Sequence, residues 1–463
     1  MPGKVYLVGC GPGAPDLLTV RAVNVMKDAD VILYDRLLDE RILNNAEKAE
    51  KINVGKKPGE ADKQEWINDL LYSKAEEEKT VVRLKNGNPV IFARGGEELK
   101  YLQERGVDVE IVPGLSSATS LAPLVGLPLT KRDVSSSLSI LTGVGKGGKN
   151  PSWENVCETA VVLMTVSNLP KVVEKLTESK MGPDTLGVLI SSGSAHEERV
   201  LVSQLFRIAD MSEFAGIEPP SILVAGDVVR ELLNVRGRSV AAFRPVRRRE
   251  RTEEIIRKGG GEPRVYGICE PNITSKDDLI DALAKNWNAL VFMSPTSVET
   301  LEGFIDFSKI KAVAVGNTTA QTLKERGVKE VVVPEKKSAE GVQNLLKEKN
   351  WKVLAFRSAL SDQDLKGAEN IVSYKFETVD ITETLDDYLE DIPDFTLLTS
   401  AGMLKVLLEK AGEEGKKSKF VESLNESFIL SLGRKCSTFA ESQGVKINYE
   451  FPEPNLESFF VGG

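Results

Sequence analysis

The stretch VYLVGCGPGAPDLLTVRAVNVMKDADVILYD, residues 5–35, decides the fold class. Residues 5–9 read as a buried β-strand, the glycines that follow as a tight turn, and the next segment as an amphipathic helix. A second apolar strand, VILYD, occupies residues 31–35. Because strands alternating with helices form sheets covered by helices, the stretch predicts an α/β fold.

Apolar strand patterns recur through the first half of the chain. They are TVVRLK (80–85), VEIVPG (109–114), LSILTG (138–143), AVVLMTV (160–166), LGVLISSG (186–193) and SILVAGDVV (221–229). Most of them are separated by segments of helix length, which favours sheets covered by helices on both faces.

The chain is too long for one hydrophobic core. Its 463 residues exceed the roughly 300 at which single cores stop growing, so two or more domains are expected. The α/β pattern restarts in VRGRSVAAFRPVRRRERTEE (235–254), and we place a domain boundary near residue 238. The arginine cluster in this segment fits either a solvated helix start or a contact with an anionic ligand.

Charge and cysteine content exclude several classes of function. A net charge of −9 argues against a nucleic-acid partner, and no apolar run approaches the length of a membrane span. The N-terminus enters a strand pattern rather than a signal peptide, so we expect the cytoplasm. Four scattered cysteines and one histidine, His196, argue against disulfides, a Cys/His metal site and imidazole-based catalysis.

The second half contains an internal repeat. ALVFMSPTSVETL (289–301) is matched by FTLLTSAGMLKVL (395–407), and KAVAVGNTTAQTLKERGVK (311–329) by SFILSLGRKCSTFAESQGVK (427–446). Each copy places hydroxyl residues or a glycine between a strand and a helix. The repeat predicts two similar α/β lobes. Their helix N-termini suit the binding of carboxylates, or else the hydroxyl side chains there only cap the helices.

The glycine turn at Gly9, Gly11 and Gly13 leaves backbone N–H groups open to a ligand. Its spacing is GxGxG with Pro12 inside, whereas dinucleotide-binding proteins use GxGxxG. A nicotinamide oxidoreductase is therefore a poor fit.

A series of motifs carries a family resemblance over residues 1–238. In order they are VGCGPGAPDLLTVRA (8–22), VILYDRLL (31–38), VVRLKNGNPVIFARGGEE (81–98), VPGLSSA (112–118) and GLPLTKRD (126–133). They resemble the tetrapyrrole methylases, most closely the uroporphyrinogen-III C-methyltransferases. The resemblance implies two α/β lobes, at about 1–114 and 115–238, and a homodimer formed through this half. It implies methylation of uroporphyrinogen III at C2 and C7 by S-adenosyl-L-methionine (SAM), giving precorrin-2 without a metal.

The same resemblance implies the site. The residues expected around SAM are Gly9, Gly11, Pro12, Gly13, Asp35, Lys85, Asn86, Gly87, Asn88, Ser116, Ser117, Ala118 and Met164. Arg94 and Glu97 are the catalytic candidates, and Arg132 is expected to bind a substrate carboxylate. Glu97 could equally favour a helix start, and Arg132 could pair with Asp133.

Three segments depart from the family pattern. Residues 85–89 read KNGNP where the family has KGGDP, Lys131 replaces a histidine, and the aromatic-Met pair is Met164-Thr165. These changes leave an alternative open, in which the first half is an inactive tetrapyrrole-binding module or acts on another precorrin.

Residues 239–463 resemble uroporphyrinogen-III synthase. The motifs are FRP (243–245), VFMSPTSVE (291–299), AVGNTTAQTL (314–323), VSYKFET around Tyr374, LLTSAGM (397–403) and LGRKCST (432–438). The resemblance implies closure of hydroxymethylbilane with inversion of ring D, in lobes at 239–268 with 377–463 and at 271–373. Tyr374 is the candidate acid, or else a packing residue. The expected substrate-binding residues are Arg244, Ser294, Thr296, Gly316, Thr318, Ser400 and Thr438. Whether the product feeds siroheme, haem or a corrinoid stays open.

Overall fold

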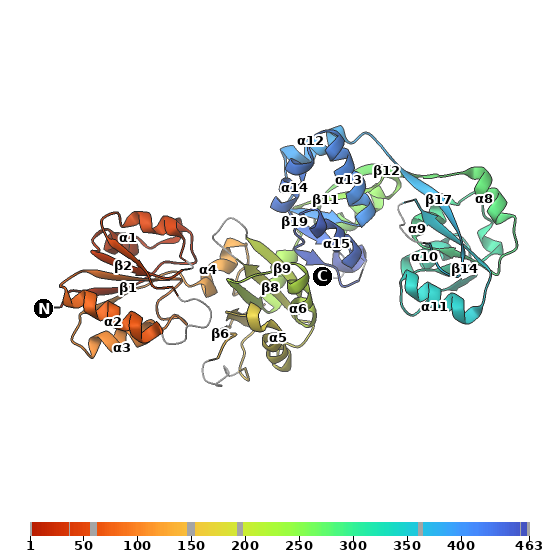
Figure 1. The fold of residues 1–463 in the computed structure, drawn as a ribbon. Coiled ribbons are helices and arrows are strands. Elements are labelled where there is room, and N and C mark those ends of the chain that lie inside the picture. Colours follow the sequence, from red (N-terminus) through yellow and green to blue (C-terminus); the bar gives the residue numbers. More distant parts are fainter. Residues whose placement is uncertain are drawn as a thin grey trace. The chain divides into compact units, whose positions relative to one another are not determined.

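The computed structural model describes residues 2–36, 38–55, 63–145, 153–191, 198–359, 364–453 and 455–460. His196 and the last two residues of the strand expected at 186–193 lie outside them. The chain forms two compact units, Met1–Asn234 with Lys446–Glu450 and Val235–Val445 with Phe451–Gly463 (Figure 1). In the described part of the chain, no helix is long and apolar enough to cross a membrane.

The first unit begins with a parallel five-stranded sheet in the order β3-β2-β4-β1-β5. Its strands are β1 Val5–Gly9, β2 Val31–Tyr34, β3 Glu50–Asn53, β4 Val81–Lys85 and β5 Val109–Val112. The helices around it are α1 Val20–Lys27, α2 Lys63–Glu76 and α3 Gly95–Gln103, with 3-10 turns at Pro15–Leu17 and Glu40–Asn45.

Alternating side chains of these strands build two cores, one on each face of the sheet. Val8 and Ile32 pack with Met26 of α1, whereas Leu7 and Leu33 pack with helix α2 on the other face. The expected helix coverage of both faces is therefore observed here.

The second sheet of this unit is mixed, which differs from the simple alternation expected. Its order is β20-β9-β8-β10-β7-β6, and β10 runs antiparallel to both of its neighbours. The strands are β6 Leu138–Thr142, β7 Thr159–Leu163, β8 Leu186–Ser191, β9 Arg199–Gln204, β10 Ser221–Ala225 and β20 Tyr449–Glu450. The helices are α4 Ser117–Leu124, α5 Leu169–Glu178 and α6 Leu205–Phe214, with 3-10 turns at Val166–Asn168 and Asp227–Leu233. The apolar runs predicted strands here but carry no information about strand direction.

In the second unit the strand order is β15-β14-β13-β16-β17-β12-β11-β18-β19. All neighbours are parallel except β12 and β17, which pair antiparallel. The strands are β11 Ser239–Pro245, β12 Glu262–Ile273, β13 Ala289–Phe292, β14 Lys311–Ala314, β15 Glu330–Val332, β16 Val353–Ser358, β17 Glu369–Thr378, β18 Phe395–Leu398 and β19 Phe428–Ser431. Figure 1 shows β12 and β17 as the long strands joining the two lobes of this unit.

Helices flank both lobes of the second unit. They are α7 Arg249–Lys258, α8 Lys276–Leu283, α9 Pro295–Thr300, α10 Asn317–Glu325, α11 Ala339–Lys349, α12 Thr382–Glu390, α13 Ala401–Glu413, α14 Lys417–Glu426, α15 Arg434–Ser442 and α16 Leu456–Phe460, with 3-10 turns at Val246–Arg248 and Phe307–Lys309. The repeat read from the sequence corresponds to β13-α9 with β18-α13 and to β14-α10 with β19-α15. The α/β class is thus confirmed, and the sheets of the second unit are parallel except for the β12–β17 pair.

Candidate functional site

Four glycines meet at the carboxyl ends of β1, β4 and β5. The N–H of Gly87 donates to the carbonyl of Gly11 at 2.7 Å, and Gly11 donates back to Gly87 at 3.3 Å. A Cβ on Gly9 would lie 2.5 Å from the backbone nitrogen of Gly114 and 2.6 Å from the carbonyl oxygen of Gly87. We call Gly9, Gly11, Gly87 and Gly114 the glycine cradle. It occupies the strand ends at which open α/β sheets bind ligands.

Gly114 was not among the residues expected at the site. A Cβ there would lie 2.4 Å from the carbonyl oxygen of Gly87, so Gly114 is as constrained as Gly9. Its position directly after an apolar strand, in VPGLSS, was the available signal. The Asn88 amide nitrogen donates to the Gly114 carbonyl at 3.1 Å, while its oxygen accepts from Val90 N–H at 3.1 Å. Asn88 therefore joins the two loops although it departs from the family pattern.

The other residues of the glycine-rich segments take ordinary local roles. Ser116 caps helix α4, with its hydroxyl accepting from the N–H of Ala118 at 3.3 Å, and Ser117 begins that helix. Gly13 has a φ of 131°, which side chains rarely adopt. Asn86 is exposed.

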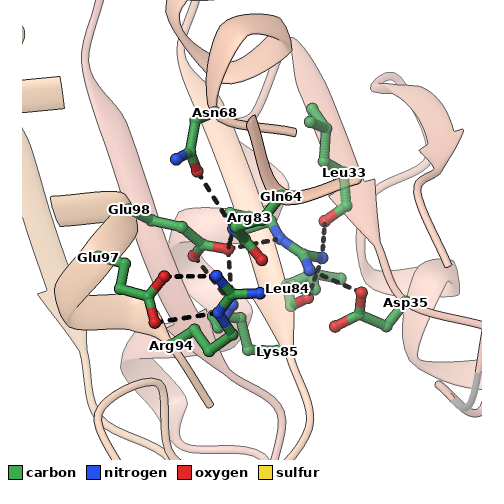
Figure 2. Close-up of polar contacts among 10 residues, drawn as sticks. All are labelled: Leu33, Asp35, Gln64, Asn68, Arg83, Leu84, Lys85, Arg94, Glu97 and Glu98. Atoms are coloured by element: carbon green, nitrogen blue, oxygen red, sulfur yellow. Dashed lines mark hydrogen bonds and ion pairs between the residues drawn. The ribbon is translucent and has the colours of Figure 1, made fainter. Parts of the chain in front are cut away.

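The side chains of Asp35 and Lys85 belong to one network of charged groups (Figure 2). The Arg83 Nη2 donates to Asp35 Oδ1 at 2.6 Å, and the Lys85 Nζ lies 2.8 and 2.9 Å from the two oxygens of Glu98. Burial, followed by the nearby Arg83 charge, lowers the pKa of Lys85 below its ordinary value. Since the ammonium of Lys85 is committed to Glu98, this residue reaches the cradle through its carbonyl, which accepts from Cys10 N–H at 2.9 Å.

Arg94 and Glu97 bind each other. The Arg94 Nε donates to Glu97 Oε1 at 3.0 Å, and this hydrogen bond raises the pKa of Arg94. Arg94 adopts a left-handed φ of 60° before helix α3, a conformation that costs free energy in a residue with a Cβ. Glu97 lies in the first turn of α3, as the helix-start interpretation expected.

Met164 also carries backbone strain. It follows β7 with a φ of 53° and is 48% exposed, which is unusual for a large apolar side chain. The next hydroxyl, Thr165 Oγ1, is buried without a hydrogen-bond partner among the described residues. Strain and an unsatisfied buried hydroxyl are both features that ligand sites tolerate.

Arg132 does not pair with Asp133 in the described part of the chain. Instead the neighbouring Lys131 binds Glu231, with Nζ 2.6 Å from Oε1. Arg132 is exposed, and Asp133 has a left-handed φ of 63°. The guanidinium of Arg132 is therefore available to a ligand carboxylate.

In the second unit, Tyr374 and Ser294 come together. The Tyr374 hydroxyl lies 3.0 Å from Ser294 Oγ, and burial raises the pKa of Tyr374 above its ordinary value. The tyrosine lies on β17 and is 4% exposed. Ser294 also caps α9 by accepting from the N–H of Ser297 at 3.0 Å. A protonated phenol beside a second hydroxyl can donate a proton or a hydrogen bond.

Arg244 is half-buried near the end of β11. Burial, and then the Arg248 charge, lower the pKa of Arg244 to about 10, and its Nε donates to Thr252 at 3.1 Å. Arg248 forms an ion pair with Glu299, with Nη2 2.7 Å from Oε1. Arg248 belongs to the arginine cluster of residues 235–254, whereas Glu299 was not among the predicted site residues.

The arginines of the cluster in residues 235–254 differ in their surroundings, so a solvated helix start and a contact with an anionic ligand each fit some of them. Arg249 pairs with Glu253 and Arg251 with Glu457 at exposed positions, which fits a solvated helix start. Arg248 is only 25% exposed, so it alone of these three is partly enclosed.

The remaining predicted binders of the second unit lie at helix starts, except Thr438, which lies within α15. Ser400 caps α13 by accepting from the N–H of Met403 at 3.2 Å, and Gly316 is the residue before α10. Thr296 is buried, whereas Thr318 is exposed. The Thr438 hydroxyl donates within its own helix to the carbonyl of Arg434 at 2.9 Å.

Comparison with known proteins identifies the families. The model of the tetrapyrrole (corrin/porphyrin) methylases matches residues 4–209. The chain is 38% identical over 239 residues to the uroporphyrinogen-III C-methyltransferase of Methanocaldococcus jannaschii, covering 50% of this chain and 99% of that relative. The chain belongs to the tetrapyrrole methylase family. Behind this methylase half, the model of the uroporphyrinogen-III synthase HemD matches residues 250–460, which confirms the expected fusion of two families.

Other relatives of the methylase half are longer. A siroheme synthase of Saccharophagus degradans is 43% identical over 234 residues, covering 49% of this chain and 51% of the relative. The chloroplastic S-adenosyl-L-methionine-dependent uroporphyrinogen III methyltransferase of Arabidopsis thaliana is 41% identical over 236 residues, covering 49% of this chain and 64% of the relative. The chain thus spans about half the length of the first relative.

Proposed function

We propose that the chain is a bifunctional enzyme of tetrapyrrole synthesis. Its second unit cyclises hydroxymethylbilane to uroporphyrinogen III with inversion of ring D. Its first unit then methylates uroporphyrinogen III at C2 and C7 with SAM and yields precorrin-2. The glycine cradle, in which a Cβ on Gly9 would collide with backbone atoms at 2.5 Å, is the observation that carries this proposal. The names of the archaeal and plant relatives support the substrate and the methyl donor.

The methylase residues fit a SAM site without a metal. When bound, SAM supplies an electrophilic methyl group to a nucleophilic pyrrole carbon. The glycine cradle offers backbone close to the ligand, and Asp35 and Met164 add one polar and one apolar side chain. Holding the reactants in line is the chief requirement of such a transfer. Arg132 binds a substrate carboxylate, and the Arg94–Glu97 pair exchanges with substrate charges or accepts the released proton.

In the second unit, the proposed acid is Tyr374. Its buried hydroxyl, 3.0 Å from Ser294, assists departure of the substrate hydroxyl as water. Arg244, Thr296, Gly316, Thr318, Ser400 and Thr438 complete the proposed binding surface for the substrate carboxylates. Backbone N–H groups at the starts of α10 and α13 provide further donors.

We also propose a division of the two activities near residue 238 and a homodimer through the methylase half. The separation of the two units between Asn234 and Val235 supports this boundary, although Lys446–Glu450 returns to the first unit. The four cysteines form no disulfide among the described residues, which supports a reducing compartment such as the cytoplasm.

An anaerobic assay with hydroxymethylbilane, with and without SAM, tests the proposal. We expect uroporphyrinogen III without SAM and a doubly methylated product with it, resolved by chromatography and mass. Type III product that SAM leaves unmethylated would retain the synthase and favour the binding-module alternative for the methylase half. Type I product in both reactions would contradict the synthase assignment.

A further inference from the structure

A buried charge network lies between β4, the central strand of the first sheet, and helices α2 and α3. Arg83 and Lys85 point from the same face of β4 toward Glu98 of α3, and the three side chains are at most 5% exposed (Figure 2). Gln64 of α2 also donates to Glu98, at 3.0 Å. Nothing in the proposed reaction uses Arg83 or Glu98 directly.

The charges of this network do not balance without Asp35. Lys85 neutralises Glu98 through two hydrogen bonds of 2.8 and 2.9 Å. Arg83 approaches Glu98 only to 3.6 Å, and its Nε has no hydrogen-bond partner among the described residues. The positive charge of Arg83 is therefore paired mainly with Asp35, whose Oδ1 lies 2.6 Å from Nη2. A buried charge is tolerated only when it is paired and hydrogen-bonded.

The geometry fixes one oxygen of Asp35 and leaves the other open. Arg83 is itself held because Nη1 donates to the carbonyl of Leu84 at 2.9 Å while Nη2 holds Asp35 Oδ1. Asp35 Oδ2 has no hydrogen bond in the described part of the chain, and the side chain is 36% exposed. Arg83 thus holds one oxygen of the Asp35 carboxylate, and the other oxygen is accessible to a ligand.

The strand register places this carboxylate beside the glycine cradle. Tyr34, the last residue of β2, pairs with Leu84 of β4, and Lys85 of β4 pairs with Gly9 of β1. Asp35 thus directly follows β2, which is the neighbour of β4 and lies two strands away from β1.

We infer that Arg83 is a positioning residue, which holds the Asp35 carboxylate at the edge of the cradle so that its free oxygen accepts from an N–H donor of the bound ligand. Both the ammonium of SAM and the pyrrole N–H groups of the macrocycle have this chemistry. The inference rests on the proposed methyl transfer. It assigns to Arg83 a function that a residue buried only for packing would lack.

The test compares Arg83→Met, Asp35→Asn and the double variant in the full chain. Arg83→Met leaves Lys85 and Glu98 as a neutral pair and leaves Asp35 to water, so it should fold. Asp35→Asn leaves the Arg83 charge unpaired and should lower the melting temperature more. Charge pairing alone would give the same order of melting temperatures. The positioning role of Arg83 is therefore tested by the rate of methyl transfer.

We expect Arg83→Met to lower kcat/KM for methyl transfer at least tenfold, about the effect of one charge-assisted hydrogen bond. In the Asp35→Asn background the same change should cost less than twofold, because the carboxylate that it positions is already gone. Arg83→Lys should keep the melting temperature but recover less than half of the activity, because an ammonium cannot hold Leu84 and Asp35 as a guanidinium fork does. Equal losses from Arg83→Met in both backgrounds would overturn the inference.

Two further measurements identify the ligand that donates to Asp35, and one further variant serves as the control. A calorimetric affinity for S-adenosylhomocysteine that falls in Arg83→Met assigns the donor to the cofactor's ammonium. An unchanged affinity with a raised KM for uroporphyrinogen III assigns it to the macrocycle, and no change in either would overturn the inference. Arg207→Met is the matched control, because Arg207 pairs at 2.8 Å with the buried Glu450 on the second sheet, away from the glycine cradle. Absence of methyl transfer in the unaltered chain would instead refute the proposed function.

Discussion

Replacing Gly9 by alanine tests the glycine cradle most directly. The added Cβ would lie 2.5 Å from Gly114 N, 2.6 Å from Gly87 O and 2.7 Å from Gly114 Cα, whereas ordinary contacts are 3.4–4 Å. All three atoms belong to the backbone, so no side chain can rotate away. The loops must separate by about 1 Å, and overpacking of this kind costs about 1–3 kcal/mol.

Separation of the loops also strains their hydrogen bonds. Gly87 and Gly11 are joined at 2.7 Å, and Asn88 holds the Gly114 carbonyl at 3.1 Å. Loss of either would add about 1 kcal/mol. We therefore expect the Gly9→Ala variant to lose about 2–4 kcal/mol in the free energy of unfolding of the first unit. Its affinity for SAM should fall at least tenfold, since about 1.4 kcal/mol corresponds to that factor.

Calorimetry with S-adenosylhomocysteine and urea unfolding measure the two effects. Gly96→Ala is the matched control, because a Cβ there has no heavy atom within 4 Å and alanine is favoured over glycine inside helix α3. The control should bind normally and be slightly more stable. The cyclisation of hydroxymethylbilane reports whether the second unit stays intact. Wild-type affinity in Gly9→Ala would refute the cradle as the SAM site.

Three other predictions concern titratable groups. Tyr374→Phe should lower kcat for cyclisation about a hundredfold while methylation of added uroporphyrinogen III persists, and an unchanged kcat would make Tyr374 a packing residue. Burial raises the pKa of Tyr388 to about 12 from 10.0. Its stabilising effect is therefore complete below pH 10 and is lost as the pH rises toward 12. Urea unfolding should show a loss of about 1.4 kcal/mol at pH 11 from this group, absent in Tyr388→Phe. Burial also raises the pKa of Cys10 to about 12, so iodoacetamide at pH 8 should modify the half-buried Cys157 first, and mass spectrometry would refute this if Cys10 reacted equally fast.

Local sequence signals were sufficient for the fold class and most strands. Apolar runs marked β1, β2, β4 and β5, and the structure places them within two residues of the expected bounds. The helix expected after the glycine turn is shorter, because Pro15–Leu17 forms a 3-10 turn and Thr19 caps α1, accepting from Ala22 N–H at 3.1 Å. Such capping is set by one side chain, which the hydrophobic pattern does not report.

The sequence by itself determined which residue types follow each strand. It therefore identified the glycines, the hydroxyl residues and Asp35 as candidate site residues. Motif order determined the two families. Only the tertiary structure decided that Gly114 closes the cradle, that Lys85 binds Glu98 and that Arg83 holds Asp35. These contacts join residues far apart in sequence, and they depend on strand order and register. A periodic pattern specifies which face of a strand is buried, but the partner that a buried charge finds is fixed only when the strands and helices pack.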